Sequence, residues 1–126
     1  MLSQEVNDRY TRVGAGTPTG ELMRRYWHPV AAVSQMNDKS TKKIRLLGED
    51  LILYKDRSGT YGMVEPHCAH RRMNMIYGIP EENGLRCPYH GWCYRLDGEI
   101  CATPDIGGPA GIGGTWTISL VEAHDV

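Results

Sequence analysis

The chain has 126 residues, of which 23% are charged and 40% hydrophobic, with 14 basic and 15 acidic side chains. Such a length and composition are typical of one globular domain, and the near-neutral charge gives no basic surface for a nucleic acid. No apolar run approaches the roughly 20 residues that span a bilayer, and the N-terminus lacks the apolar region of a signal peptide. We therefore expect a cytoplasmic protein with no nucleic-acid and no membrane partner. Its four cysteines are then metal ligands or free thiols rather than disulfides.

Residues 1–26 predict an N-terminal segment of two short helices. Ser3 is a suitable N-cap for the first helix, and Thr17 followed by Pro18 provides an N-cap and a first-turn proline for the second. The second helix must end before Pro29. Both helices are too short to be stable alone, so we expect them to pack on the domain or on a neighbouring subunit.

Residues 27–126 predict one mainly β domain. Its strands are expected at residues 27–33, 43–47, 50–54, 60–65, 92–96, 99–101 and 115–121. Turn sequences separate several of them, at residues 48–49, 56–59, 97–98 and in the glycine-rich stretch 105–114. Many short strands with turn signals between them predict an antiparallel β sandwich or a small barrel. His28 is expected to be a structural residue of the first strand.

Two short clusters carry the chemistry of the sequence, CAH at residues 68–70 and CPYH at residues 87–90. In extended backbone, residues two positions apart point to the same side, so Cys68 and His70 can face one metal centre. A mononuclear zinc site more often uses Cys-x2-Cys or His-x3-His pairs. One cysteine and one histidine from each of two loops suit a dinuclear cluster, with two cysteines on one iron and two histidines on the other.

The two clusters, the sixteen residues between them, and Gly-Trp after the second resemble the binding motif of Rieske [2Fe-2S] proteins. The resemblance implies a Rieske-type antiparallel β sandwich with a two-loop cluster-binding subdomain. It also implies a [2Fe-2S] cluster as the cofactor. Cys68 and Cys87 would hold the buried iron, and His70 and His90 would hold the outer iron near the surface.

Respiratory and photosynthetic Rieske proteins resemble this chain at the ligands but carry an extra, disulfide-forming cysteine in each loop. Met73 and Tyr89 stand at those positions here, and Trp92 replaces a serine that donates a hydrogen bond to the cluster. Fewer hydrogen bonds to the cluster sulfurs leave the reduced state less stable, so we expect a potential of about −150 mV. Tyr94 is either a further donor to a cysteine sulfur or an ordinary strand aromatic.

The segments LSQEVNDRYTRVGAGTPTGELMRRYWHPVA and YHGWCYRLDGEICATP resemble the oxygenase component of Rieske non-heme iron oxygenases of the phthalate-dioxygenase-like group. In that family a reductase or ferredoxin supplies electrons, and the Rieske domain passes them to a mononuclear iron in a separate domain that activates O2. The resemblance implies aromatic hydroxylation or demethylation by the full-length parent, and a homotrimeric assembly. Only His28, His67 and His124 remain beyond the cluster motif, without the pattern of a mononuclear iron triad. We expect no oxygen activation by this chain alone.

Two other interpretations stay open at this point: a free-standing Rieske ferredoxin that shuttles electrons, and a zinc-stabilised structural module. Chain length favours the shuttle, whereas the N-terminal helices favour the oxygenase component. Arg71 and Arg72 follow a ligand-like histidine and are either a docking site for an acidic reductase or a solvated basic pair. His67 is expected to be an exposed loop histidine, and the piece Met73-Asn74-Met75 is expected to fill the core beneath the first loop.

Overall fold

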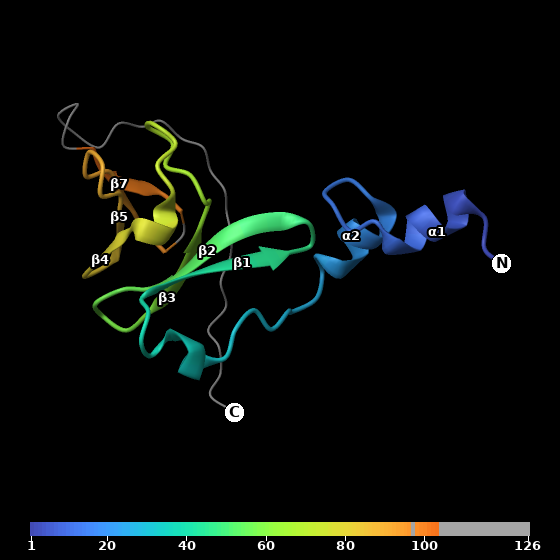
Figure 1. Cartoon of the computed structure of the whole chain (residues 1–126), viewed down its shortest axis with the longest axis horizontal. Coiled ribbons are helices and arrows are strands. Elements are labelled where there is room, and N and C mark those ends of the chain that lie inside the picture. Colours follow the sequence, from blue (N-terminus) through green and yellow to red (C-terminus); the bar gives the residue numbers. More distant parts are fainter. Residues whose placement is uncertain (97, 104–126) are drawn as a thin grey trace.

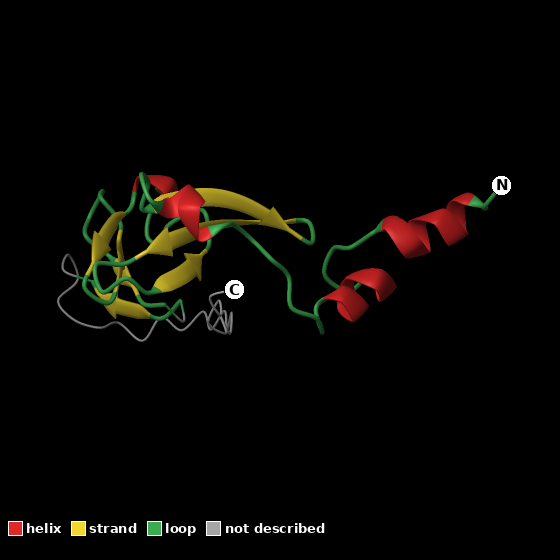
Figure 2. Cartoon of the chain, turned by 90° about the horizontal axis from the view of Figure 1, so that it is seen from below, coloured by secondary structure: helices red, strands yellow, loops and turns green. Residues whose placement is uncertain are grey.

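The structure, a computed structural model, describes residues 1–96 and 98–103. It consists of an N-terminal helical arm that projects from two small antiparallel sheets, as Figures 1 and 2 show from two directions. The expected glycine-rich loop at residues 105–114 and the expected strand at residues 115–121 lie outside the described residues. Among the described residues, none of the helices has the length and the apolar composition of a membrane span.

The two helices of the arm begin where the sequence predicts. Helix α1 (Gln4–Thr11) starts at the N-cap Ser3, and helix α2 (Pro18–Met23) starts at the N-cap Thr17. The hydroxyl of Ser3 accepts the Val6 N–H at 3.3 Å and that of Thr17 accepts the Gly20 N–H at 3.2 Å, so each cap satisfies an otherwise unpaired amide.

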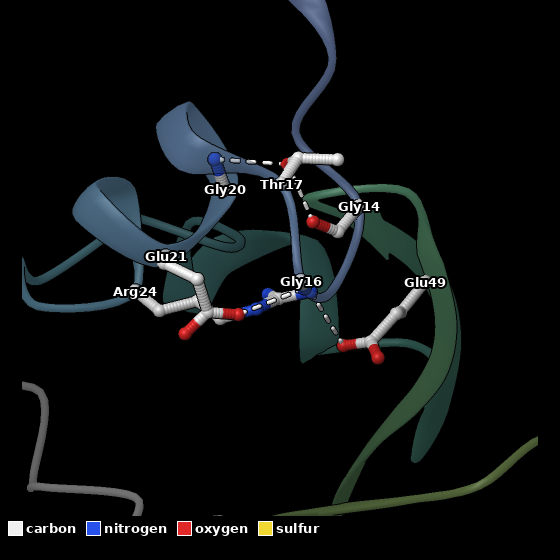
Figure 3. A network of polar contacts seen from close by, with 7 residues as sticks. All are labelled: Gly14, Gly16, Thr17, Gly20, Glu21, Arg24 and Glu49. Carbon is white, nitrogen blue, oxygen red and sulfur yellow. Dashed lines mark hydrogen bonds and ion pairs between the residues drawn. The ribbon is translucent and has the colours of Figure 1, made fainter.

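The arm contacts the β domain at one hairpin (Figure 3). The Arg24 guanidinium at the end of α2 lies 3.6 Å from the Glu49 carboxylate. Within the arm, the Gly16 N–H donates to the Glu21 carboxylate at 2.9 Å and braces the loop before α2. The arm is therefore positioned relative to the sheets by a partly exposed ion pair, which alone contributes about 1 kcal/mol at most.

The first sheet has the order β1-β2-β3 and is antiparallel throughout. Its strands are β1 (Thr41–Leu46), β2 (Glu49–Lys55) and β3 (Tyr61–Val64). Leu47 and Gly48 join β1 to β2, and both have positive φ, 49° and 82°. Two positive φ angles are what a two-residue type I′ hairpin turn requires. The predicted hairpin is confirmed, with its turn one residue earlier than expected.

The second sheet has the order β4-β5-β6-β7 and is also antiparallel. Its strands are β4 (Ile79–Glu81), β5 (Gly84–Arg86), β6 (Cys93–Tyr94) and β7 (Ile100–Ala102). The predicted hairpin across residues 97–98 is present as β6 and β7. Strand β4 was not predicted, since it is only three residues long and contains a proline. Two antiparallel sheets and few short helices confirm the predicted mainly β fold class.

The strand predicted at residues 27–33 is wrong. These residues pair with no described strand, and the chain instead enters a 3-10 helix, η1 (Val33–Met36). Pro29 has no N–H to contribute to a ladder, and Trp27 keeps 72% of its surface exposed, so neither supports a buried strand. His28 is consequently not a strand residue, and its ring nitrogen donates to the Met23 carbonyl at 2.7 Å, at the end of α2.

Strand β2 separates two hydrophobic clusters, because alternate residues of a strand point to opposite faces. Ile52 and Tyr54 face the main core, whereas Leu53 faces a smaller cluster with Met36 of η1. The main core joins the two sheets and the loops that carry the cysteine–histidine motifs. Its buried members are Ile52, Tyr54, Val64, Cys68, Met75, Leu85, Cys87, Trp92 and Tyr94.

Candidate metal centre

The loop that carries the first motif follows β3 and is closed by backbone hydrogen bonds. The Cys68 N–H donates to the Met73 carbonyl at 2.8 Å, and the Arg72 N–H donates back to the Cys68 carbonyl at 2.8 Å. Arg72 has a positive φ of 62°, a conformation that costs free energy for a residue with a side chain. His67 and Asn74 form an isolated bridge at the base of the loop.

The loop that carries the second motif connects β5 to β6 and is built in the same way. The Cys87 N–H donates to the Trp92 carbonyl at 2.7 Å, and the Gly91 N–H donates back to the Cys87 carbonyl at 3.1 Å. Gly91 has a φ of 81° at the position that Arg72 occupies in the first loop. Each cysteine thus begins a turn of the same hydrogen-bond pattern, with its histidine two or three residues further on.

The two thiols lie together in the core. Cys68 and Cys87 are each 2% exposed, and their thiols lie close enough to interact. Burial raises the pKa of Cys87, the contact with Cys68 raises it further, and the Tyr89 and His90 amides donate to its sulfur and oppose the rise. The two buried thiols are in contact, and amides point at one of them. This arrangement favours binding of a metal centre, which thiols ligate in their deprotonated form.

The two imidazoles lie together nearer the surface. The ring centroids of His70 and His90 are 4.7 Å apart at an interplanar angle of 72°. Trp92 stacks on His70 with a centroid distance of 4.7 Å and an angle of 5°, and Tyr89 packs on His90 at 3.9 Å. Both histidines are half-buried, whereas both cysteines are fully buried. The structure therefore brings all four predicted residues together as a buried pair and an outer pair.

Tyr94 completes the buried side of the site. Its hydroxyl oxygen accepts the Ala69 N–H at 2.9 Å and lies 3.1 Å from the Cys68 sulfur. When the Cys68 sulfur is deprotonated it has no proton to give, and Tyr94 is then the donor of this hydrogen bond. Burial, followed by the contact with Cys68, raises the pKa of Tyr94 well above its usual value, so it keeps this proton.

The donor set fits a dinuclear iron–sulfur cluster. Nδ1 of His90 is buried and has no hydrogen-bond partner among the described residues, which is costly for an imidazole nitrogen unless a ligand occupies it. Within residues 1–96 and 98–103, no three His, Cys, Asp or Glu side chains converge on a position for a single metal ion. Two ligands on each of two irons need no such convergence.

An ion pair holds the base of the second loop. The Arg86 Nε donates to the Glu81 carboxylate at 2.6 Å, and its Nη1 donates to the Gly91 carbonyl at 2.9 Å. The hydrogen bond between Arg86 and Glu81 lowers the pKa of Glu81 below its ordinary value of 4.5. Arg86 thereby links β4, β5 and the loop that carries His90.

The other sequence-predicted residues lie around the site rather than in it. His67, Arg71 and Arg72 are exposed, as expected for loop residues. Of the piece predicted as core filler, Met75 is 1% exposed in the main core and Met73 packs against it, whereas Asn74 is exposed. The sequence left the role of Tyr94 open, and the structure places it at the cysteine sulfur. The role of Arg86 was missed, although a cation directly before Cys87 is a signal in the sequence.

A fold of two small antiparallel sheets with paired cysteine–histidine loops defines the class of iron–sulfur domains with mixed ligands. The family model of the Rieske [2Fe-2S] domain matches residues 26–112. The chain belongs to this family, and the cofactor of the family is the Rieske [2Fe-2S] cluster.

Curated relatives are Rieske oxygenase subunits. The chain is 52% identical over 113 residues to the 5,5'-dehydrodivanillate O-demethylase oxygenase subunit of Sphingobium sp., covering 88% of this chain and 27% of that protein. It is 41% identical over 102 residues to the phthalate 4,5-dioxygenase oxygenase subunit of Pseudomonas putida, covering 79% of this chain and 23% of that protein. The chain therefore spans about a quarter of the length of these relatives.

Solved structures share the fold. The Pseudomonas putida CBB5 NdmA QL mutant with caffeine aligns at a TM-score of 0.63 and 29% identity, over 77% of this chain and 30% of that one. Dicamba monooxygenase bound to dicamba aligns at a TM-score of 0.52 and 27% identity, over 63% of this chain and 25% of that one. These alignments confirm the Rieske fold that the sequence predicts.

Proposed function

We propose that Cys68 and Cys87 hold the inner iron of the cluster, and that His70 and His90 hold the outer iron. The observation that carries this assignment is the paired arrangement. Two fully buried thiols are in contact, and two half-buried imidazoles lie with their centroids 4.7 Å apart. The partnerless Nδ1 of His90 supports it further, since a metal bond would satisfy that nitrogen.

When bound, the cluster supplies a centre that takes up and releases one electron at a time. The residues of the chain tune this centre. Tyr94 and the Tyr89 and His90 amides direct donors at the cysteine sulfurs and favour negative charge there. Trp92 stacks on His70 and fixes the plane of its ring, but it has no hydroxyl to donate. We therefore propose a potential near the low end of the Rieske range, about −150 mV.

We further propose that the chain is the electron-transfer part of a ring-hydroxylating or demethylating oxygenase. A reductase or ferredoxin would supply the electrons, and a mononuclear iron elsewhere in the oxygenase would receive them. The support is the similarity to oxygenase subunits, which extends over 88% of the chain. That similarity favours the oxygenase over a free-standing ferredoxin shuttle. The reducing cytoplasm is the proposed compartment, since the site depends on reduced thiols.

The arm and the outer histidines offer separate surfaces to such partners. Arg71 and Arg72 are exposed beside the first loop, where two positive charges suit an acidic electron donor. Where the arm meets the β domain, Tyr26 and Trp27 are 64% and 72% exposed, which suits coverage by another subunit of the homotrimer proposed for the full-length parent. We retain residues 1–26 and 27–126 as the proposed division of the chain.

Ligand variants test the assignment. The chain is reconstituted with iron and sulfide under anaerobic conditions, and bound iron, sulfide and visible absorption are measured. We expect Cys68→Ser, Cys87→Ser, His70→Ala and His90→Ala to lose most of the bound cluster.

The chain offers a matched control for each ligand type. Cys93→Ser removes a buried cysteine and His67→Ala removes an adjacent histidine, and both should bind the cluster as the unmodified chain does. A colourless protein that binds one zinc ion would contradict the proposal. Loss of the cluster in the controls but not in the ligand variants would contradict the assignment of residues.

A further inference from the structure

Two cysteines outside the metal centre lie against each other on neighbouring strands. Cys93 is in β6 and Cys101 is in β7, and both are free thiols. The Cys101 thiol donates to the Cys93 carbonyl at 3.3 Å, and it lies close enough to the Cys93 thiol to raise its pKa. Neither is a residue of the cysteine–histidine motifs, and the proposed electron-transfer function uses neither.

A β-bulge brings the two thiols to the same face. Cys93 pairs with Ala102 and Tyr94 pairs with Ile100, so Cys101 is an extra residue in the ladder. In a regular ladder the residue next to Ala102 would point away from the face on which Cys93 lies. The bulge allows two residues of β7 to oppose one residue of β6, and it turns the Cys101 thiol toward Cys93. The bulge therefore places the two thiols on the same face of the sheet.

The two thiols differ in access and in charge environment. Cys93 is 5% exposed, and burial, followed by its contact with Cys101, raises its pKa to about 12. Cys101 is only half-buried and can meet a small reagent from solvent. The charge of the Arg86 guanidinium opposes part of the rise in the pKa of Cys93. Cys101 is thus placed to react first and Cys93 to react second.

We propose that Cys93 and Cys101 are a modification site, a dithiol that forms a reversible disulfide by exchange with a low-molecular-weight disulfide. The Cys101 thiolate attacks the small disulfide, forms a mixed disulfide and releases one small thiolate. Cys93 then gives up its proton and attacks the Cys101 sulfur, which forms the bridge and releases the second thiolate. The two protein protons end on the two small thiols, so the protein loses two electrons and the small disulfide gains them.

The two cysteines are close enough for a bridge to be considered. Disulfides span Cα distances of about 4.4–6.8 Å, and across the bulge the Cys101 sulfur already lies 3.3 Å from the carbonyl oxygen of Cys93 itself. The bridge would join β6 to β7 one residue beyond Trp92, whose carbonyl accepts the Cys87 N–H at 2.7 Å. It would therefore brace the base of the second motif loop and resist separation of β7 from the sheet.

Exchange with glutathione disulfide tests the proposal on the full chain carrying its cluster. Free thiols are blocked with iodoacetamide after the reaction, and tryptic peptides are analysed by mass spectrometry. We expect the peptide of residues 87–95 to be joined to that of residues 96–126, with fragment ions placing the bond on Cys93. Both alkylated forms of Cys93 and Cys101 should disappear, and excess reduced glutathione should restore them.

Two serine variants separate the first thiol from the second. In Cys93→Ser, Cys101 should accumulate as the glutathione mixed disulfide, because nothing displaces the glutathione. In Cys101→Ser, the buried Cys93 should stay unmodified. An unmodified pair in the wild-type chain, a stable mixed disulfide there, or a bond to Cys68 or Cys87 would each overturn the proposal. The visible absorption of the same samples reports the cluster separately, so this result does not depend on the outcome for the ligand assignment.

Discussion

The Tyr94 hydroxyl lies 3.1 Å from the Cys68 sulfur although the two residues are 26 positions apart in the chain. Pairing of Leu85 with Tyr94 between β5 and β6 carries the phenol under the first loop, where the Ala69 amide fixes its oxygen at 2.9 Å. One side chain of the second sheet is therefore hydrogen-bonded to the loop that follows the first sheet, and it acts directly on a proposed ligand sulfur.

Replacing this tyrosine should lower the reduction potential. Tyr94→Phe keeps the ring in the core but removes the donor that favours negative charge on the Cys68 sulfur. A hydrogen bond worth about 0.5–1.5 kcal/mol corresponds to a decrease of about 20–60 mV for a one-electron couple. The midpoint is measured by redox titration of the visible spectrum. Tyr77→Phe, at a residue that is 67% exposed, should leave it unchanged, and an unchanged midpoint in Tyr94→Phe would rule out the donor role.

The exposed arginines of the first loop should accelerate reduction by an acidic donor. Replacing Arg71 and Arg72 together by alanine is expected to slow reduction about tenfold at low salt, with a smaller effect at high salt, because steering by charge is screened. Stopped-flow mixing with a reduced acidic ferredoxin gives the rate. The double lysine variant keeps both charges and should retain most of it. Equal rates for the alanine variant and the wild type at low salt would show that Arg71 and Arg72 do not attract the donor.

Gly84 should not tolerate a side chain. A Cβ at this position would lie 2.3 Å from the Tyr94 carbonyl oxygen and 3.3 Å from the Cys93 sulfur, so β5 and β6 would have to separate. We expect Gly84→Ala to lower the free energy of unfolding by about 1–3 kcal/mol in urea denaturation. Gly14→Ala is the matched control, because its Cβ would meet no atom within 4 Å. Equal stability of the two variants would show that the strands are not packed this closely.

Acid should weaken the base of the second loop. The hydrogen bond from Arg86 lowers the pKa of Glu81 below 4.5, so this carboxyl binds its proton more weakly in the folded chain than in the unfolded one. Its contribution to stability is present above pH 4.5 and is lost as the pH falls through the folded-state pKa. Thermal unfolding between pH 6 and pH 3 should show a shallower loss for Glu81→Gln than for the wild type. Glu82→Gln should behave as the wild type does, and a parallel decline in all three would contradict the role of the ion pair.

Features with a local chemical cause were predictable from the sequence. Ser3 and Thr17 cap the helices as predicted, because a side-chain oxygen at an N-cap satisfies a nearby amide whatever the rest of the fold does. The proximity of the two motif loops followed from ligand type and spacing. In the second loop, Gly91 is a residue that readily adopts the observed positive φ of 81°.

Features that depend on partners distant in sequence were not predictable in the same way. Arg72 takes a positive φ of 62° because the hydrogen bonds of the first loop impose it, and no property of arginine signals it. Strand β4 pairs despite Pro80, since a proline at an edge strand need not donate to the ladder. Residues 27–33 have the apolar pattern of a strand, but no strand among the described residues pairs with them.

We propose that Cys68, His70, Cys87 and His90 together hold one mixed-ligand [2Fe-2S] cluster. The most direct test is the electron paramagnetic resonance spectrum of the dithionite-reduced chain, recorded with iron and sulfide counts on the same sample. We expect two irons and two sulfides per chain, with an average g value lower than that of a cluster held by four cysteines. A silent spectrum with bound zinc, or a g value typical of four-cysteine ligation, would contradict it.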